Sequence, residues 1–188
     1  MSNIMQISGG VCAPQGFRAA GIHCGIAKSF DKKDLALIAS DIKCIASAVY
    51  TRNIVKAAPL LVTRANIQNG FAQAIICNSG NANACTPDGE KIARKMCELC
   101  AGALDIPPED VIVASTGVIG KPLSINPIDA NMPRLADALS ENGSDSCSGA
   151  IMTTDTLKKE IAVEFGLGGK PCRIGAIAKG SGMIHPNM

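Results

Sequence analysis

Short apolar runs separated by polar breaks dominate the first third of the chain and predict β-strands. The first run covers residues 17–27, and two more cover 35–40 and 43–51, with Asp41 between them. The polar break at Asp41 predicts that the second and third runs form a hairpin or a meander. A short helix is predicted over 58–69, because the residue that follows is a glycine that can end it.

Residues 87–104 carry the clearest helical pattern in the sequence. Thr86 is a candidate N-cap, and Pro87 suits the first helical position. Asp88 and Glu90 place negative charge at the positive end of the helix dipole. The apolar face consists of Ile92, Met96, Leu99, Cys100, Ala103 and Leu104. We therefore expect a helix over this whole stretch.

Strands and helices follow one another in the rest of the chain without strict alternation. Apolar runs with glycine or proline boundaries predict strands at 71–77, 110–115, 158–165 and 171–180, a helix over 127–140, and a short helix or turn over 148–156. This mixed order favours an α/β sandwich over a doubly wound parallel sheet. No repeat or long linker divides the sequence, so residues 1–188 are expected to form a single unit.

Composition narrows the class of protein. The chain is 47% hydrophobic but only 3% aromatic, so its core must be built mainly from aliphatic side chains. A net charge of +2 and few aromatic rings argue against nucleic-acid binding. A mean hydropathy of +0.21 hints at surface that a partner covers. No apolar stretch approaches the roughly 20 residues that span a bilayer, and the N-terminus lacks a signal pattern, so we expect a cytoplasmic protein without a membrane partner.

Nine cysteines at scattered spacings argue for reduced thiols rather than a disulfide framework. Cys97 and Cys100 form the only short metal-type spacing, and a zinc site would need a second pair nearby that the chain does not supply. Both lie in the last turns of the predicted helix, Cys100 on its apolar face, so we expect them to pack in the core. No metal site is predicted.

Two loops rich in small polar residues stand at strand ends: NSGNANACT at 78–86 and STGVIG at 115–120. The sequence contains neither the glycine-rich nucleotide fingerprints nor the serine esterase motif. Loops of this kind turn tightly and expose backbone N–H groups, which suits an anion or a developing oxyanion. Taken singly, each loop also fits an ordinary tight turn.

The order of several motifs resembles one enzyme family. They are NSGNANACT (78–86), ASTGVIG (114–120), MTTDT (152–156) and AKGSGMIHPNM (178–188), with further similarity at 10–27 and 49–53. This set resembles the ornithine acetyltransferases, also called glutamate N-acetyltransferases or the ArgJ family, over essentially the whole chain. The resemblance implies an α/β layered sandwich of mixed sheets and helices, of the DmpA/ArgJ type, completed by a separate β chain.

In that family the precursor cuts itself between an alanine and a threonine, just after the HPNM segment. The new N-terminal threonine of the β chain is the nucleophile. The resemblance implies that this sequence is the α chain, ending at Met188 one residue before the usual alanine. The implied partner is the β chain of the same precursor, in an α2β2 heterotetramer.

The implied reaction belongs to arginine biosynthesis. It moves an acetyl group from N-acetylornithine to glutamate by a ping-pong mechanism through an acetyl-threonine. No cofactor is implied, and because some members also accept acetyl-CoA as a co-substrate, its use here stays open. Family positions place the oxyanion hole at Thr116 and Gly117, and substrate contacts at Thr153 and Lys179. His185 is expected to shape the cleavage loop rather than to act as a general base.

One departure and two rival interpretations accompany the resemblance. The family commonly has Cys-Thr-Gly where this chain has Cys85-Thr86-Pro87, which weakens any substrate role for that loop. A self-cleaving aminopeptidase of the DmpA type would share the fold and the nucleophile but hydrolyse an amide. A thiol-rich metal-binding protein would account only for the cysteines.

Overall fold

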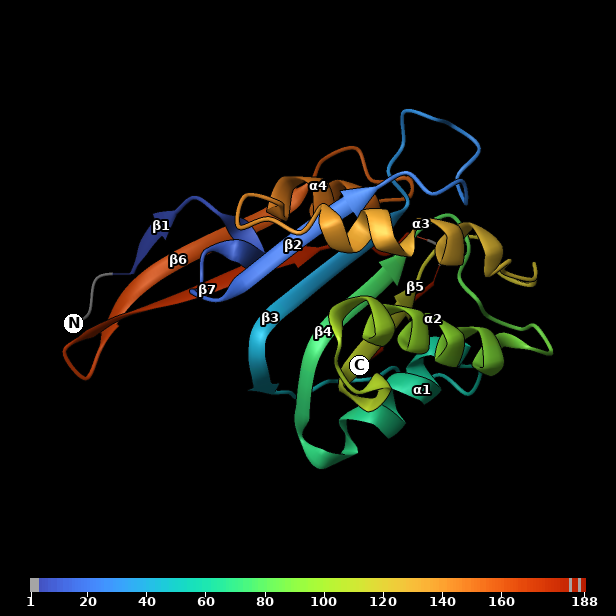
Figure 1. Cartoon of the computed structure of the whole chain (residues 1–188), viewed down its shortest axis with the longest axis horizontal. Helices are drawn as coiled ribbons and strands as arrows, with labels where there is room; N and C mark the ends of the chain where they lie inside the picture. The colour runs from blue at the N-terminus through green and yellow to red at the C-terminus, as the bar shows by residue number, and fades with distance from the viewer. Residues whose placement is uncertain (1–3, 183, 186) are drawn as a thin grey trace.

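The computed structural model describes residues 4–182, 184, 185, 187 and 188, which form two β-sheets and four α-helices in layers (Figure 1). The larger sheet contains β2 (Phe17–Ile22), β3 (Leu35–Ile45), β4 (Phe71–Asn78) and β5 (Val111–Ser115), in that order. β2, β3 and β4 are antiparallel neighbours, whereas β4 and β5 are parallel. The parallel pair brings the carboxyl ends of β4 and β5 to the same edge.

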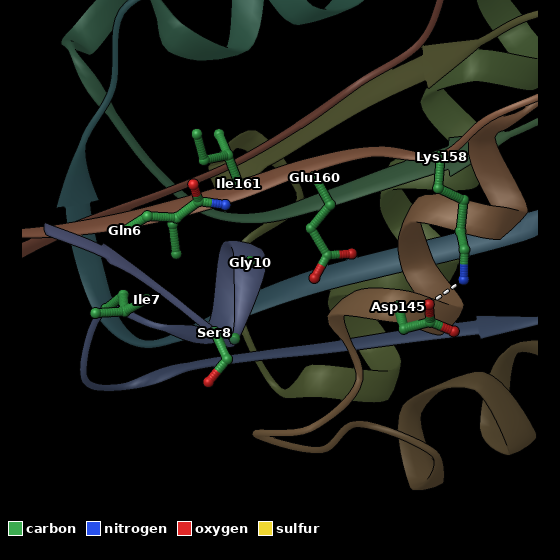
Figure 2. A pocket seen from close by; sticks show the side chains of 10 residues that line it. Gln6, Ile7, Ser8, Gly10, Asp145, Lys158, Glu160 and Ile161 are labelled. Carbon is green, nitrogen blue, oxygen red and sulfur yellow. Dashed lines mark hydrogen bonds and ion pairs between the residues drawn. The ribbon is translucent and has the colours of Figure 1, made fainter.

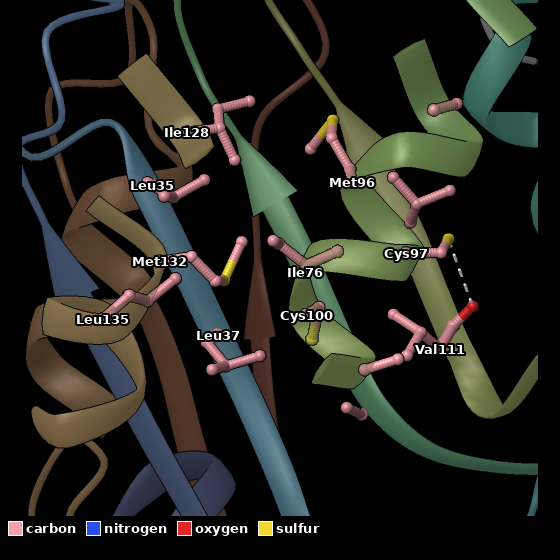
Figure 3. Packing of buried hydrophobic residues seen from close by; sticks show 14 of the residues in the cluster. Leu35, Leu37, Ile76, Met96, Cys97, Cys100, Val111, Ile128, Met132 and Leu135 are labelled. Carbon is pink, nitrogen blue, oxygen red and sulfur yellow. Dashed lines mark hydrogen bonds between the residues drawn. The ribbon is translucent and has the colours of Figure 1, made fainter. Parts of the chain in front are cut away.

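Three helices cover one face of this sheet: α1 (Ala58–Asn66), α2 (Gly89–Leu104) and α3 (Asn126–Asp137). Alternate strand residues point into the layer between them, as the period of two requires. Leu35 and Leu37 of β3 and Ile76 of β4 are fully buried there against Met96 of α2 (Figure 3). The main core is therefore aliphatic and sulfur-containing, as the composition predicted.

The second face of the larger sheet packs against α4 (Ser144–Ile151) and the smaller sheet. The smaller sheet consists of β1 (Met5–Ile7), β6 (Lys159–Leu167) and β7 (Lys170–Ala178), all antiparallel, in the order β1-β6-β7. Short 3₁₀ turns lie at Gly10–Cys12, Ile67–Asn69 and Pro108–Asp110. Side chains between these layers are small, including Ala19, Ala36 and Ala150, so α4 lies close to β2. A Cβ on Gly143 would collide with the backbone carbonyl of Ala19.

The mixed α/β layering confirms the predicted class, but several local predictions were wrong. The strand predicted over 17–27 ends at Ile22, and of the run predicted over 43–51 only residues 43–45 are in a strand. Residues 35–45 form one continuous strand, not two runs broken at Asp41. A register shift between Ala39 and Cys44 absorbs the polar residue without ending the strand. The helix predicted from 87 begins at Gly89, and the Thr86 hydroxyl makes no cap hydrogen bond within the described chain. Among the described residues, no helix has the length and apolar character needed to cross a membrane.

Candidate active site

The two loops singled out in the sequence lie side by side. Asn78 at the end of β4 pairs in register with Ser115 at the end of β5. Beyond the strands, the Thr116 amide donates to the Asn78 carbonyl at 2.9 Å, and the Ala82 amide donates to the Val118 carbonyl at 2.9 Å. The loops after β4 and β5 are thus joined by backbone hydrogen bonds into one rigid edge.

Three buried asparagines fix the loop after β4. The Asn78 side-chain amide donates to the Asn81 carbonyl at 2.9 Å, and that of Asn81 donates to the Lys121 carbonyl at 3.0 Å. Asn83 donates in the same way to the Gly89 carbonyl, at 2.9 Å. Sequence reasoning noticed the composition of this loop but not these roles, because the partners are backbone carbonyls that no residue pattern marks.

Thr116 and Gly117 sit where these loops meet. Gly117 has φ +137°, and a Cβ there would lie 2.5 Å from the Asn81 nitrogen and 2.7 Å from the Gly80 oxygen, so only glycine fits. Within the described chain, neither the Gly117 N–H nor the Thr116 hydroxyl has a hydrogen-bond partner. Both residues are half-buried. Two unengaged donors on adjacent residues of a fixed loop form a candidate oxyanion hole.

The other two predicted site residues, Thr153 and Lys179, meet at Asp155. This carboxylate accepts from the Thr153 amide at 3.3 Å and from the Gly180 amide at 2.6 Å. Its side chain is 4% exposed and also lies 3.0 Å from the Lys159 ammonium and 3.8 Å from that of Lys179. The hydrogen bond from Lys159, then those from Gly180 and Thr153, hold the pKa of the Asp155 carboxyl well below its usual range. Asp155 was not identified from the sequence.

We expect Asp155→Asn to destabilise the protein in a pH-dependent way. Because the folded-state pKa is lowered, the stabilising charge is fully present above the unfolded-state value near about 4 and is lost only as pH falls below it. The difference in free energy of unfolding between wild type and variant should stay constant from pH 7 to 5 and narrow below about 4. Denaturant unfolding across this range measures it, and a difference that already narrows above pH 5 would contradict the lowered pKa.

Cys77 connects the two halves of the site. It immediately precedes Asn78, and its partly buried side chain packs, like that of Ile177 of β7, against a small buried cluster that includes Ala36 and Cys147. Burial raises the pKa of the Cys77 thiol to about 12, against a smaller lowering by the charge of Lys179. Lys179, which follows β7, is therefore near enough to the end of β4 for its charge to act on the Cys77 thiol. A thiol with this pKa stays neutral and unreactive at physiological pH.

Residues 51–53 form hydrogen bonds with the last described residues of the chain. The Arg52 amide donates to the Asn187 carbonyl at 3.1 Å, and the Asn53 side chain donates to the His185 carbonyl at 3.1 Å. The His185 residue is exposed, and its backbone, rather than its ring, makes this contact. Two segments with motif resemblance, 49–53 and 178–188, are thus joined by hydrogen bonds, while Met183 and Pro186 lie outside the described residues.

The cysteine pair of α2 packs as predicted. Cys97 and Cys100 are 2% and 0% exposed, and burial raises the pKa of their thiols to about 11 and about 12. The Cys97 thiol donates to the Val111 carbonyl at 3.7 Å (Figure 3). In the part of the chain that the structure describes, no three His, Cys, Asp or Glu side chains gather in a way that could hold a metal ion.

A surface pocket of about 300 Å³ lies away from these residues, between the start of the chain and β6. Figure 2 shows Glu160 directed into it between Gly10 and the ion pair of Asp145 with Lys158. A second pocket of about 230 Å³ lies beside Asn66 and Cys97. Neither of these two pockets contains Thr116, Gly117, Thr153 or Lys179.

Fold and site together define a layered α/β protein with a candidate oxyanion hole at the carboxyl ends of two parallel strands. The chain belongs to the ArgJ family, whose profile matches residues 18–188. It is 51% identical over 184 residues to the arginine biosynthesis bifunctional protein ArgJ of Symbiobacterium thermophilum, and 48% identical over 190 residues to ArgJ 1 of a Nostoc species. These matches cover 97% and 100% of this chain but only 46% of each relative, so the chain spans about half their length.

Solved structures confirm the fold. A crystal structure of the arginine biosynthesis bifunctional protein ArgJ from Bacillus halodurans matches with a TM-score of 0.92 and 40% identity, over 100% of this chain and 98% of that chain. The ornithine acetyltransferase of Mycobacterium tuberculosis, solved in complex with ornithine, matches with a TM-score of 0.90 and 36% identity. The match covers 98% of this chain and 99% of that chain. The predicted layered fold of the ArgJ type is therefore correct.

Proposed function

We propose that this chain is the α chain of a self-processed acetyltransferase that moves an acetyl group from N-acetylornithine to glutamate in arginine biosynthesis. The observation that carries the proposal is the pair of unengaged donors at Thr116 and Gly117 on the fixed loop after β5. Family membership supports it, as does the similarity to an ornithine acetyltransferase solved with ornithine.

The proposed nucleophile is the N-terminal threonine of a β chain. A threonine hydroxyl is a weak nucleophile near neutral pH, but at a chain terminus the α-amino group, with a pKa near about 8, serves as its base. The hydroxyl attacks the acetyl carbonyl of N-acetylornithine, the base passes the proton to the leaving nitrogen, and ornithine departs. The amino group of glutamate then attacks the acetyl ester, which restores the threonine.

Each half-reaction passes through a tetrahedral oxyanion. In this proposal the Thr116 hydroxyl and the Gly117 N–H donate hydrogen bonds to it, and the paired loops hold both donors before the reaction begins. Lys179 holds the α-carboxylate that both substrates carry. Asp155 limits the movement of the Lys179 ammonium. No cofactor takes part, and acetyl-CoA enters only as an alternative acetyl donor.

The β chain is proposed to cover an apolar surface of the larger sheet. Phe71 and Ile75 alternate with buried residues along β4 and are 43% and 37% exposed, and Ile45 at the end of β3 is 88% exposed. Uncovered apolar side chains at this end of the sheet fit contact with a second chain of the same precursor. The length of the relatives supports such a chain, and we propose an α2β2 assembly in the cytoplasm.

The proposal predicts two polypeptides from the full reading frame. Intact mass spectrometry should find this chain and a second one that begins with threonine, and brief exposure to N-acetylornithine should add one acetyl mass to the second. A single uncut chain, or cut chains that never acquire acetyl, would contradict the proposal. Cut chains that hydrolyse amino-terminal amides without transferring acetyl to glutamate would identify an aminopeptidase instead.

A further inference from the structure

The loop between β2 and β3 is anchored by a buried carboxylate. Asp34, which is 0% exposed, accepts from the Cys24 amide at 2.6 Å and from the Ala27 amide at 2.7 Å. The His23 ring nitrogen lies 2.8 Å from the Lys32 carbonyl, which ties the two ends of the loop together. The Ser79 amide also donates to the Asp34 carbonyl, at 2.9 Å, so this loop is joined to the one that backs Gly117.

Lys32 extends from this anchored loop to the candidate site. Its ammonium donates to the Thr153 carbonyl at 2.6 Å, and its side chain is half-buried. The amide of the same threonine donates to Asp155, the carboxylate that Lys179 approaches at 3.8 Å. Two ammonium groups, those of Lys32 and Lys179, therefore flank Thr153 on its carbonyl and amide sides.

The two lysines differ in their electrostatic surroundings. Lys179 shares Asp155 with Lys159, and Lys158 pairs with Asp145. Within the described residues, no carboxylate lies within ion-pair distance of the Lys32 ammonium, which leaves its charge available to a ligand. A half-buried ammonium that is held by a backbone carbonyl can attract an anion without first breaking an ion pair.

We propose that Lys32 is a specificity-determining residue that recognises the side-chain carboxylate of the acetyl acceptor. This inference rests on the proposed function, in which both substrates present an α-carboxylate to Lys179. They differ at the side chain, which ends in an ammonium in N-acetylornithine and in a carboxylate in glutamate. The Lys32 ammonium attracts the side-chain carboxylate of glutamate and repels the side-chain ammonium of ornithine. It therefore favours the exchange of ornithine for glutamate after the enzyme is acetylated.

The test compares Lys32→Met with Lys33→Met in the complete two-chain enzyme. Methionine keeps the length of the side chain but removes the charge, and the exposed Lys33 offers the same charge change on the same loop without the contact to Thr153. Enzyme acetylation by N-acetylornithine and acetyl transfer to glutamate are measured separately, with glutamine as an uncharged acceptor of similar shape.

We expect Lys32→Met to raise the KM for glutamate about tenfold and to reduce the preference for glutamate over glutamine by a similar factor. Acetylation by N-acetylornithine should not slow, Lys33→Met should resemble wild type, and Lys32→Arg should retain the preference. Equal weakening of both half-reactions would overturn the proposal in favour of a purely structural contact with Thr153, as would an unchanged KM for glutamate. A wild-type enzyme that never forms the acetyl-enzyme would instead overturn the proposed function, and this inference with it.

Discussion

Replacing Thr116 by alanine is expected to slow acetyl transfer by about 10²–10³-fold while the protein stays folded. The hydroxyl is one of two unengaged donors at the junction of the paired loops, and removing it leaves only the Gly117 N–H for the oxyanion. The structural links of Thr116 run through its backbone, whose amide donates to the Asn78 carbonyl at 2.9 Å. Alanine preserves that hydrogen bond, so the loss should fall on kcat rather than on stability.

The measurement is the single-turnover rate of acetylation by N-acetylornithine, together with a thermal unfolding curve. Thr116→Ser keeps the hydroxyl and should retain most of the rate, which makes it the matched control. Because the proposed self-cleavage would also pass through an oxyanion, the mass of each variant must show complete processing before its rates are compared. A fully processed and folded Thr116→Ala enzyme with a near-wild-type rate would remove Thr116 from the mechanism.

The sequence predicted the secondary structure well where the local pattern is decisive. The helix predicted over 87–104 is present from Gly89, and Met96 and Cys100 of its predicted apolar face lie in the core, although Ala103 is exposed. The pattern failed at Asp41, because a register shift within β3 lets one exposed polar residue interrupt an apolar run without ending the strand. It also failed at Thr86, since N-cap preference is a statistical tendency that the local backbone overrides here.

The candidate site was only partly predictable. Thr116, Gly117, Thr153 and Lys179 were proposed from motif resemblance; in the structure Thr116 and Gly117 follow the end of β5, and Thr153 and Lys179 both lie next to Asp155. Asp155 was missed because its role depends on Gly180, which is 25 residues away in sequence. Such long-range pairs leave no periodic trace; the antiparallel pairing of β6 with β7, which sets Lys159 opposite Ala178, brings Asp155 and Gly180 together.

Gly117→Ala is expected to damage both stability and catalysis. A φ of +137° is strongly unfavourable for any residue with a Cβ, and the added atom would lie 2.5 Å from the Asn81 nitrogen and 2.7 Å from the Gly80 oxygen. These are backbone atoms, so no rotation of a side chain relieves the overlap, and the paired loops must separate. Strain and overpacking together should lower the free energy of unfolding by roughly 2–6 kcal/mol.

Gly120→Ala supplies the matched control, because Gly120 lies in the same loop with φ +76° but has no atom within 4 Å of the position its Cβ would take. It should cost only about 1–2 kcal/mol of backbone strain. Denaturant unfolding and single-turnover acetylation distinguish the two variants. If Gly117→Ala loses no more stability than Gly120→Ala, the close approach of the two loops is not what requires glycine at position 117. If it does lose stability but keeps its acetylation rate, the Gly117 N–H is not an oxyanion donor, because the separated loops can no longer hold that N–H in place.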